Sequence, residues 1–255
     1  MLRKRIIFSL IYENGFFNQS RNFRLQKVGN LQWLERNYKF KDIAFSLDEL
    51  IVLNSSRTDK DMDKFALTLS KLVDDVFIPI AAGGGIRSME DAKLLFENGA
   101  DKIVLNTVLY RDSEFVNKLV KLYGSQSIVA SIDYKKVDNV YKVFVENGTF
   151  ELDVELKDYL IYVQTLNVGE IYLNSIDKDG TGFGYDFKTI SEVVDSINIP
   201  LIIAGGAGNE SHLEKGLLIE NVNAVATANL FNFIGDGLPK ARENIINNNI
   251  NIARW

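Results

Sequence analysis

Two similar glycine-rich stretches lie far apart in the sequence, and their spacing constrains the fold more than any other feature. FIPIAAGGGIRS runs from Phe77 to Ser88, and NIPLIIAGGAGNES runs from Asn198 to Ser211, which places the matching Ala82 and Ala204 122 residues apart. In each stretch a short apolar run ends in glycines and an amphipathic segment follows, as expected for a strand buried on both faces and then a helix. The repeat indicates two halves with the same architecture.

The repeat includes segments outside the glycine stretches. Arg5–Tyr12 aligns with Ser127–Tyr134 at the same spacing of 122 residues, and Ile51–Ser55 aligns with Ile171–Ser175 at 120. Short β-rich runs alternate with helical patterns along the whole chain, which is typical of βα units that build a parallel sheet. We therefore predict four βα units in each half.

This alternation predicts individual elements. The predicted strands are Arg5–Ile11, Glu49–Asn54, Phe77–Ala82, Lys102–Asn106, Ser127–Ile132, Glu170–Asn174, Ile199–Ala204 and Ala224–Ala228. The predicted helices are Asn30–Phe40, Asp61–Val76, Ser88–Glu97, Asp112–Tyr123, Val154–Leu166, Asp186–Ile197 and Glu210–Ile219. Ser88, Asp112 and Asp186 are the expected N-caps.

Eight βα units in about 250 residues predict an α/β fold, a (βα)8 TIM barrel built from two repeated half-barrels. We expect one domain over residues 1–255, with half-barrels at approximately 1–122 and 123–255. An open doubly wound sheet is the alternative, but no GxGxxG motif follows the first strand.

Two segments interrupt the pattern. Glu13–Gly29 is a long polar loop, which we interpret as a mobile lid, and Tyr134–Gly148 predicts a β-hairpin around Asp138-Asn139.

Composition excludes several classes of function. The chain is 46% hydrophobic and 25% charged with a net charge of −5, which argues against an extended nucleic-acid or anionic-membrane surface. It has no cysteine, which excludes disulfides, thiolate metal sites and a cysteine nucleophile. The single histidine, His212, cannot form a metal site alone, and we expect no metal or cofactor. No apolar run approaches the ~20 residues of a membrane span, so we expect a soluble cytoplasmic protein.

The glycine stretches carry the residue types that bind phosphate. Glycines at the end of a strand let backbone N–H groups approach a ligand, and the start of the next helix adds a partial positive charge. In a barrel of this type the active site lies at the carboxyl ends of the strands, where short polar residues also occur. We predict two anion sites, formed by Gly84, Gly85, Asn106 and Thr107 and by Gly205, Gly206, Ala228 and Asn229. Tight turns without a ligand are the alternative.

Charged residues stand at both ends of the predicted strands. Asp133 ends an apolar strand, where burial suits it to acid–base chemistry, although a helix cap or a salt bridge is an equal alternative. Asp179 precedes a glycine, which favours a plain turn. At the opposite end, strands begin with Arg5, Glu49, Lys102 and Glu170. Two charges of each sign at one end of a barrel predict an ion-paired ring, and four unrelated surface charges are the alternative.

Several motifs resemble one family. These are MLRKRII, AGGGIRSMEDA, GADK, GSQSIVASID, SIDKDGTGFGYD and AGGAG, and together they are similar to the cyclase subunit of imidazole glycerol phosphate synthase (HisF) over nearly the whole chain. The resemblance implies a barrel that forms a heterodimer with a HisH-like glutaminase docked at its amino-terminal face. In that family, ammonia reaches a bis-phosphorylated ribulosyl substrate, an imidazole ring closes, and two aspartates transfer protons.

The residues that carry catalysis in the family are only partly present. Asp133 matches the second-half aspartate, whereas Ile11 occupies the place of the first-half aspartate, and isoleucine cannot transfer a proton. Gln19 stands in place of a loop lysine, and Asn54 stands where an aspartate is expected. The resemblance assigns Asp179 to the active site as a second catalytic carboxylate.

Other family positions are kept. Phosphate-site or active-site positions are matched by Gly85, Asn106, Thr107, Gly180 and Gly206. The four charges that gate the family's ammonia passage are matched by Arg5, Glu49, Lys102 and Glu170.

The pattern of loss favours a divergent HisF-like member, because removing a general acid or base costs ~10²–10⁴ in rate. The favoured hypothesis is a synthase subunit that passes ammonia to a phosphorylated or nucleotide-activated acceptor, for amidine formation on a surface-polysaccharide sugar. It implies a third partner, a sugar-modifying amidotransferase. One alternative is a working imidazole glycerol phosphate synthase subunit of histidine biosynthesis, and another is a non-catalytic scaffold that activates a glutaminase.

Overall fold

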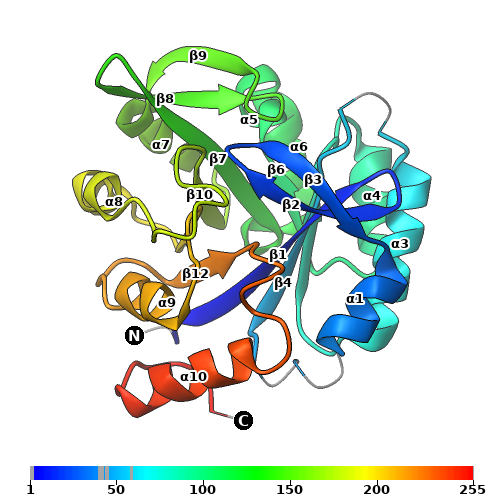
Figure 1. The fold of residues 1–255 in the computed structure, drawn as a ribbon. Coiled ribbons are helices and arrows are strands. Elements are labelled where there is room, and N and C mark those ends of the chain that lie inside the picture. The colour runs from blue at the N-terminus through cyan, green and yellow to red at the C-terminus, as the bar shows by residue number, and fades with distance from the viewer. Residues whose placement is uncertain (1–2, 40–42, 44–45, 58–59, 255) are drawn as a thin grey trace.

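The computed structural model describes residues 3–39, 43, 46–57 and 60–254, and over these residues eight parallel strands close into a barrel (Figure 1). The strands are β1 (Arg5–Glu13), β4 (Glu49–Asn54), β5 (Ile80–Gly83), β6 (Lys102–Leu105), β7 (Ile128–Val137), β10 (Glu170–Ser175), β11 (Leu201–Ala204) and β12 (Ala224–Thr227). They pair in this order, and the β6–β7 and β12–β1 pairings join the two halves of the chain and close the barrel. The predicted TIM barrel is confirmed, and its division into two half-barrels stays a prediction.

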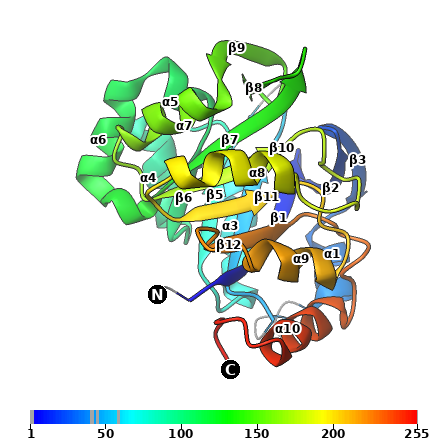
Figure 2. The ribbon, with the colours of Figure 1, turned by 90° about the vertical axis from the view of Figure 1, so that its left-hand side faces the viewer.

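Helices pack around the outside of the barrel (Figure 2). They are α1 (Leu31–Tyr38), α3 (Met62–Asp75), α4 (Met89–Glu97), α5 (Thr107–Arg111), α6 (Ser113–Tyr123), α7 (Leu156–Gln164), α8 (Phe187–Val193), α9 (Glu210–Leu217) and α10 (Gly237–Asn247). The predicted N-caps are confirmed: Ser88, Asp112 and Asp186 each accept a hydrogen bond from a backbone N–H in the first turn. Phe40, the last residue of one predicted helix, lies outside the described residues. No helix in the described part of the chain is both long and apolar enough to cross a membrane.

The apolar faces of the amphipathic helices pack against the barrel. In α3, for example, Phe65, Leu69 and Leu72 are fully buried, at the i, i+4 and i+7 spacing that places side chains on one helix face. The last helix, α10, is held by Arg242, which forms a bidentate buried ion pair with Asp48 at 2.9 Å on both oxygens. This pair ties the end of the chain to the start of β4.

Two antiparallel hairpins continue from the carboxyl ends of barrel strands. The predicted hairpin after the fifth barrel strand is confirmed: β7 extends into β8 (Val140–Val145), and a further strand, β9 (Phe150–Glu155), pairs with it. The predicted lid at Glu13–Gly29 is not an irregular loop, because β1 extends to Glu13 and pairs with β2 (Phe16–Arg21), which pairs with β3 (Arg24–Gly29). Its turn residues Asn22 and Phe23 both have positive φ, at 49° and 62°, the geometry of a tight hairpin turn.

The interior of the barrel is filled by side chains that alternate with those facing the helices. One fully buried cluster occupies this interior and is separate from the larger core between strands and helices. Its members are Ile7, Ile51, Ala81, Val104, Val129, Tyr172, Ile202, Ala204, Ala224 and Ala226. Tyr172 is the single aromatic residue of this cluster, and its hydroxyl lies 3.2 Å from the hydroxyl of Ser9.

Candidate active site

A cavity of about 740 Å³ opens at the carboxyl ends of the barrel strands. It is lined by all eleven residues predicted to take part in catalysis or phosphate binding, namely Gly84, Gly85, Asn106, Thr107, Asp133, Asp179, Gly180, Gly205, Gly206, Ala228 and Asn229. The structure therefore brings the predicted site residues of both halves of the chain to one space. Their roles in binding and catalysis stay predictions.

The two glycine loops, Gly83-Gly84-Gly85 and Gly205-Gly206, have matching geometry in the two halves. Gly84 has φ +94° and Gly205 has φ +89°, which disfavours any residue with a side chain. A Cβ on Gly84 would lie 2.2 Å from the carbonyl oxygen of Asn54, and one on Gly205 would lie 2.6 Å from that of Ser175. Glycine is required at both positions because each loop packs on the end of the preceding barrel strand. In both halves the loop backbone therefore lines the cavity with no side chain of its own to cover it.

Asp133 is a buried carboxylate on the floor of this cavity. Its two oxygens each accept a hydrogen bond of 3.1 Å, Oδ1 from the amide of Asn174 and Oδ2 from the amide of Asn106. Burial raises the pKa of Asp133 to about 7, the negative charge of Asp179 acts in the same direction, and the two amides oppose the shift. No lysine or arginine among the described residues neutralises it. A carboxyl group with this pKa exchanges a proton readily near neutral pH.

The positions that depart from the family pattern also lie at this cavity. Ile11, from β1, and Asn54, from the end of β4, both line it. Gln19 lines it from β2, and its side-chain oxygen accepts a hydrogen bond of 2.9 Å from the backbone N–H of Leu230. Gln19 therefore connects the β2–β3 hairpin to the segment after β12. Its amide contributes no positive charge to the cavity.

Asp179 has contacts that the sequence did not predict. Its carboxylate accepts hydrogen bonds from the hydroxyl of Ser20 at 2.5 Å and from the backbone N–H of Phe23 at 3.0 Å. Its carbonyl oxygen accepts a third from the N–H of Asn22. Burial raises the pKa of this carboxyl group, and the contacts with Phe23 and Ser20 oppose the shift. Asp179 thus latches the β2–β3 hairpin over the cavity, and its predicted catalytic role stays a prediction.

Four cationic side chains line the cavity, and the sequence pattern did not identify them as a group. They are Arg57, Lys60, Arg87 and Arg111. One signal was available, since Arg87 stands two residues after the last glycine of AGGGIRS. The others come from loops and a short helix, whose direction the hydrophobic pattern does not specify. Within the described ranges no group of three or more carboxylate or histidine side chains is placed to hold a metal ion.

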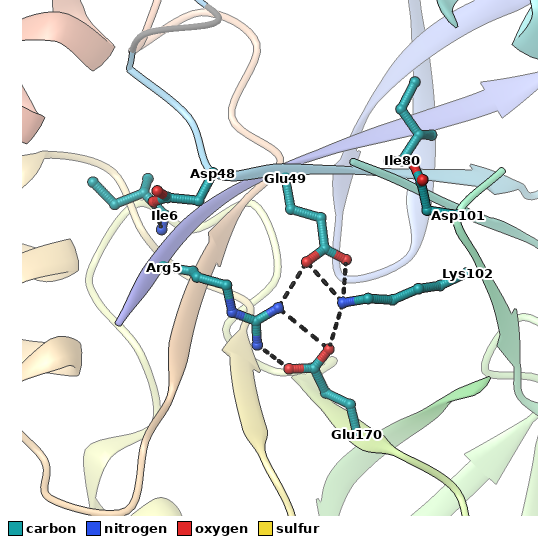
Figure 3. Close-up of polar contacts among 8 residues, drawn as sticks. All are labelled: Arg5, Ile6, Asp48, Glu49, Ile80, Asp101, Lys102 and Glu170. Carbon is teal, nitrogen blue, oxygen red and sulfur yellow. Dashed lines mark hydrogen bonds and ion pairs between the residues drawn. The ribbon is translucent and has the colours of Figure 1, made fainter. Parts of the chain in front are cut away.

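The four charges at the starts of the strands meet at the opposite end of the barrel (Figure 3). We call Arg5, Glu49, Lys102 and Glu170 the charge quartet. Arg5 contacts Glu49 at 2.7 Å and also Glu170, and Lys102 contacts Glu49 at 2.9 Å and Glu170 at 3.1 Å. Each cation therefore contacts both carboxylates. The predicted ring forms, whereas its role as a gate stays a prediction.

Burial determines the electrostatics of the quartet. Glu49 and Glu170 are almost fully buried, and burial raises the pKa of Glu49 while Lys102 and Arg5 oppose this shift. Nearby, Asp48 and Asp101 accept hydrogen bonds of 2.8 Å from the N–H groups of Ile6 and Ile80, respectively (Figure 3). These carboxylates fix the ends of the strands around the ring.

Comparison with known proteins gives one consistent result. The profile of the family described as "Histidine biosynthesis protein" matches residues 38–235. A protein of Parasynechococcus marenigrum (strain WH8102), named provisionally as imidazole glycerol phosphate synthase subunit hisF2, is 47% identical over 256 residues, covering 100% of this chain and 95% of the relative. The imidazole glycerol phosphate synthase subunits HisF of Chlorobium limicola (strain DSM 245 / NBRC 103803 / 6330) and Chlorobium phaeobacteroides (strain DSM 266 / SMG 266 / 2430) are 35% and 36% identical over 244 residues, covering 95% of this chain and 96% of each relative.

Proposed function

This chain belongs to the histidine biosynthesis protein family as a HisF-type member, and from that premise we propose that it is the synthase subunit of a glutamine amidotransferase. In this proposal a HisH-like glutaminase docks at the charge quartet and releases ammonia into the barrel. At the carboxyl end, the ammonia forms a C–N bond to an activated carbon of a phosphorylated or nucleotide-activated acceptor, while the C–O bond of that carbon breaks and its oxygen leaves with an activating group. The product is an amidine on a sugar of a surface polysaccharide, made together with a third, sugar-modifying amidotransferase.

The observation that carries this proposal is the difference between the two residues that would face the substrate. Asp133 is buried, held by two amides, and has a pKa of about 7, whereas Ile11 lines the same cavity with an aliphatic side chain. Ring closure in the HisF family uses one carboxylate from each half, so this cavity has half of the proton-transfer pair. Addition of ammonia to an activated carbon needs one group that removes a proton, and Asp133 suits that requirement.

The charge quartet supports the choice of ammonia as the nitrogen source. Its members match the gate positions of the family, and the ring is closed by four ion pairs. Buried charges are costly to retain without a function, and replacement of such networks by apolar residues is often neutral or stabilising. The retention of all four charges beside a changed catalytic pair favours a subunit that still receives ammonia.

The levels of similarity favour divergence from the histidine pathway. The chain is 47% identical to the protein named hisF2 and 35% identical to HisF of Chlorobium limicola. A working HisF is the second candidate, and the two glycine loops of matching geometry favour it because they suit a substrate with a phosphate at each end. Under that alternative Asp133 would act with a substitute acid such as Glu13 or Tyr12.

Ring closure from the ribulosyl intermediate separates these candidates. Supplied with excess ammonium, the purified chain should turn over this substrate at least about 10²-fold more slowly than a homologue with both aspartates, because one acid–base group is missing. Turnover near that of the homologue would overturn the proposal and identify a working HisF. Co-purification with a HisH-like glutaminase, followed by identification of the aminated product, would then test the acceptor directly.

A further inference from the structure

The two glycine loops differ in the charges around them, although their backbones match. The cavity lining includes four cations, Arg57, Lys60, Arg87 and Arg111, and Lys60 packs against Gly85 of the first loop. The lining near the second loop includes Ala204, Ala207, Thr227, Ala228 and Asn229, and the one lysine that packs against this loop, Lys178, is not among the cavity-lining residues. A single phosphate bound by backbone N–H groups needs no such excess of positive charge. The first loop is therefore built for an anion of higher charge than the second.

Two of the four cations are free of the contacts that would neutralise them. Arg111 forms an ion pair with Glu146, and Arg57 donates to the carbonyl oxygen of Phe23 at 2.6 Å. Lys60 and Arg87 form no ion pair within the described residues. Lys60 is half-buried, and its ammonium group donates to the carbonyl oxygen of Asn54 at 3.1 Å. That same oxygen abuts Gly84, so the ammonium group lies directly at the first glycine loop.

Lys60 also packs closely against Gly85, the next residue of the first glycine loop. A Cβ on Gly85 would lie 2.6 Å from Cδ of Lys60, which means that the lysine stem packs on the bare backbone of the loop. Burial lowers the pKa of Lys60 to about 8, and the positive charge of Arg87 adds to this effect. Two like charges at a ligand cavity repel each other unless an anion binds between them. Lys60, Arg87 and Gly85 all line the cavity, so an anion bound there would relieve this repulsion.

The neighbouring side chains make this end of the cavity still less acidic. Asn54 and Ile11 occupy positions where the HisF family has aspartates, so two negative charges of the family pattern are missing here. Asn54 is 2% exposed, its side-chain oxygen accepts from the N–H of Ser56 at 3.2 Å, and its amide nitrogen has no partner within the described residues. An unpaired buried donor beside an unpaired lysine is a second, independent sign of a missing acceptor group.

We propose that Lys60 and Arg87, together with the first glycine loop, bind a diphosphate group, whereas the second glycine loop binds at most a single phosphate. The loop N–H groups would hold one phosphoryl group, and the ammonium and guanidinium groups would hold the other, since both donate charge-assisted hydrogen bonds to phosphate oxygens. The assignment of this diphosphate to the activating group of the ammonia acceptor rests on the proposed function. Under that function, the diphosphate site would select a nucleoside-diphosphate sugar over a phosphate monoester.

Calorimetric titration with inorganic pyrophosphate and with orthophosphate, on the full chain at pH 7, tests the site. We expect pyrophosphate to bind at least about tenfold more tightly than orthophosphate. Lys60→Gln and Arg87→Gln should each lower the affinity for pyrophosphate about tenfold or more while changing that for orthophosphate little, because each removes a charged hydrogen-bond donor. Lys60→Arg should keep most of the affinity and shows that the variants report on charge.

Lys178→Gln is the matched control, because Lys178 lies beside Gly206 of the second loop but does not line the cavity. It should leave both affinities unchanged. Equal affinities of the unaltered chain for the two anions would overturn the inference, as would a Lys60→Gln variant that binds pyrophosphate normally. These measurements need neither glutaminase nor ammonia, so their failure would leave the proposed amidotransferase function standing. Conversely, tight pyrophosphate binding without any amination would contradict only the proposed function.

Discussion

The two ends of the barrel differ in whether their charged side chains are paired. At the amino-terminal end, the two cations of the charge quartet each contact both carboxylates, and the ring is electrically complete. At the carboxyl end, Arg111 pairs with Glu146, but other charges of the cavity stay unpaired: Asp133 has no cation partner and Lys60 has no carboxylate partner among the described residues. Burial moves both groups toward neutrality, because it raises the pKa of Asp133 to about 7 and, with the nearby charge of Arg87, lowers that of Lys60 to about 8.

This difference separates charges that maintain the structure from charges that are available to a ligand. In the completed ring each charged side chain has partners of opposite charge, so binding a ligand there would require an existing ion pair to break. An isolated buried charge costs free energy in the folded state, and it persists where a ligand or a reaction uses it. Substitutions in the two classes of charge should therefore have different consequences.

Removal of the isolated carboxylate should affect chemistry most. Asp133→Asn should lower ammonia-dependent product formation ~10²–10⁴-fold, because the amide cannot accept a proton. Turnover at saturating ammonium chloride measures this effect without the glutaminase. The control is Asp177→Asn, since Asp177 is exposed and outside the cavity lining. Activity within tenfold of the unaltered chain would instead support a non-catalytic scaffold.

Breaking the completed ring should affect stability most. Glu49→Gln should lower the free energy of unfolding by about 3–5 kcal/mol, because it leaves the ring with an uncompensated buried positive charge. Urea denaturation measures this value. Glu97→Gln provides the matched control: its ion pair with Lys93 is 3.5 Å long and both side chains are more than 60% exposed, so the change should stay below about 0.5 kcal/mol. Equal effects in the two variants would show that the ring is not electrically coupled.

The pH dependence of stability provides a third test. The folded state keeps the Asp133 proton up to about pH 7, whereas the unfolded chain releases it near pH 3.8. The folded state is therefore favoured below pH 4, and its advantage is lost as the pH rises to 7, by about 4 kcal/mol in total. Asp133→Asn should remove this slope and be more stable than the unaltered chain at pH 8. Parallel urea-stability curves for the two proteins at pH 5 and 8 would contradict the pKa.

The hairpin latch gives the smallest expected effect. Asp179→Asn should weaken the contacts with Ser20 and Phe23 and lower the local opening free energy of residues 16–29 by about 1–3 kcal/mol. Hydrogen–deuterium exchange of these residues measures it. Ser20→Ala, which removes one of the two hydrogen bonds, should have a smaller effect. Unchanged exchange in both variants would show that Gln19 and strand pairing hold the hairpin without Asp179.

The sequence predicted the order of the strands better than their ends. The predicted strand at Phe77 begins only at Ile80, and that at Ile199 begins only at Leu201, because Pro79 and Pro200 lack the N–H that a central strand donates. Phe77 is 83% exposed, which its hydrophobicity does not suggest. At the other ends, β1 and β7 run further than predicted, since each continues into a hairpin. Hydrophobic runs identify buried strand segments and do not mark hydrogen-bonded ends.

The cavity was predictable where residues sit on strands and unpredictable where they sit on loops. Asp133, Asn106 and both glycine loops follow barrel strands, so topology alone brings them together. Lys60 lies in a loop whose path no periodic pattern specifies. The latch of Asp179 joins residues that are more than 150 positions apart, and only the folded chain shows that its carboxylate faces the hairpin.

The aliphatic cluster inside the barrel has a consequence for transport. Ile7, Ile51, Val129 and Ile202 are fully buried between the charge quartet and the cavity, and they offer no group that could solvate an ion. Moving an unpaired charge through such a layer is strongly unfavourable, as it is in the centre of a lipid bilayer. Under the proposed function, ammonia would therefore have to cross this layer as the uncharged molecule and not as ammonium. On the cavity side of this layer, Tyr172 and Ser9 both line the cavity and their hydroxyls lie 3.2 Å apart.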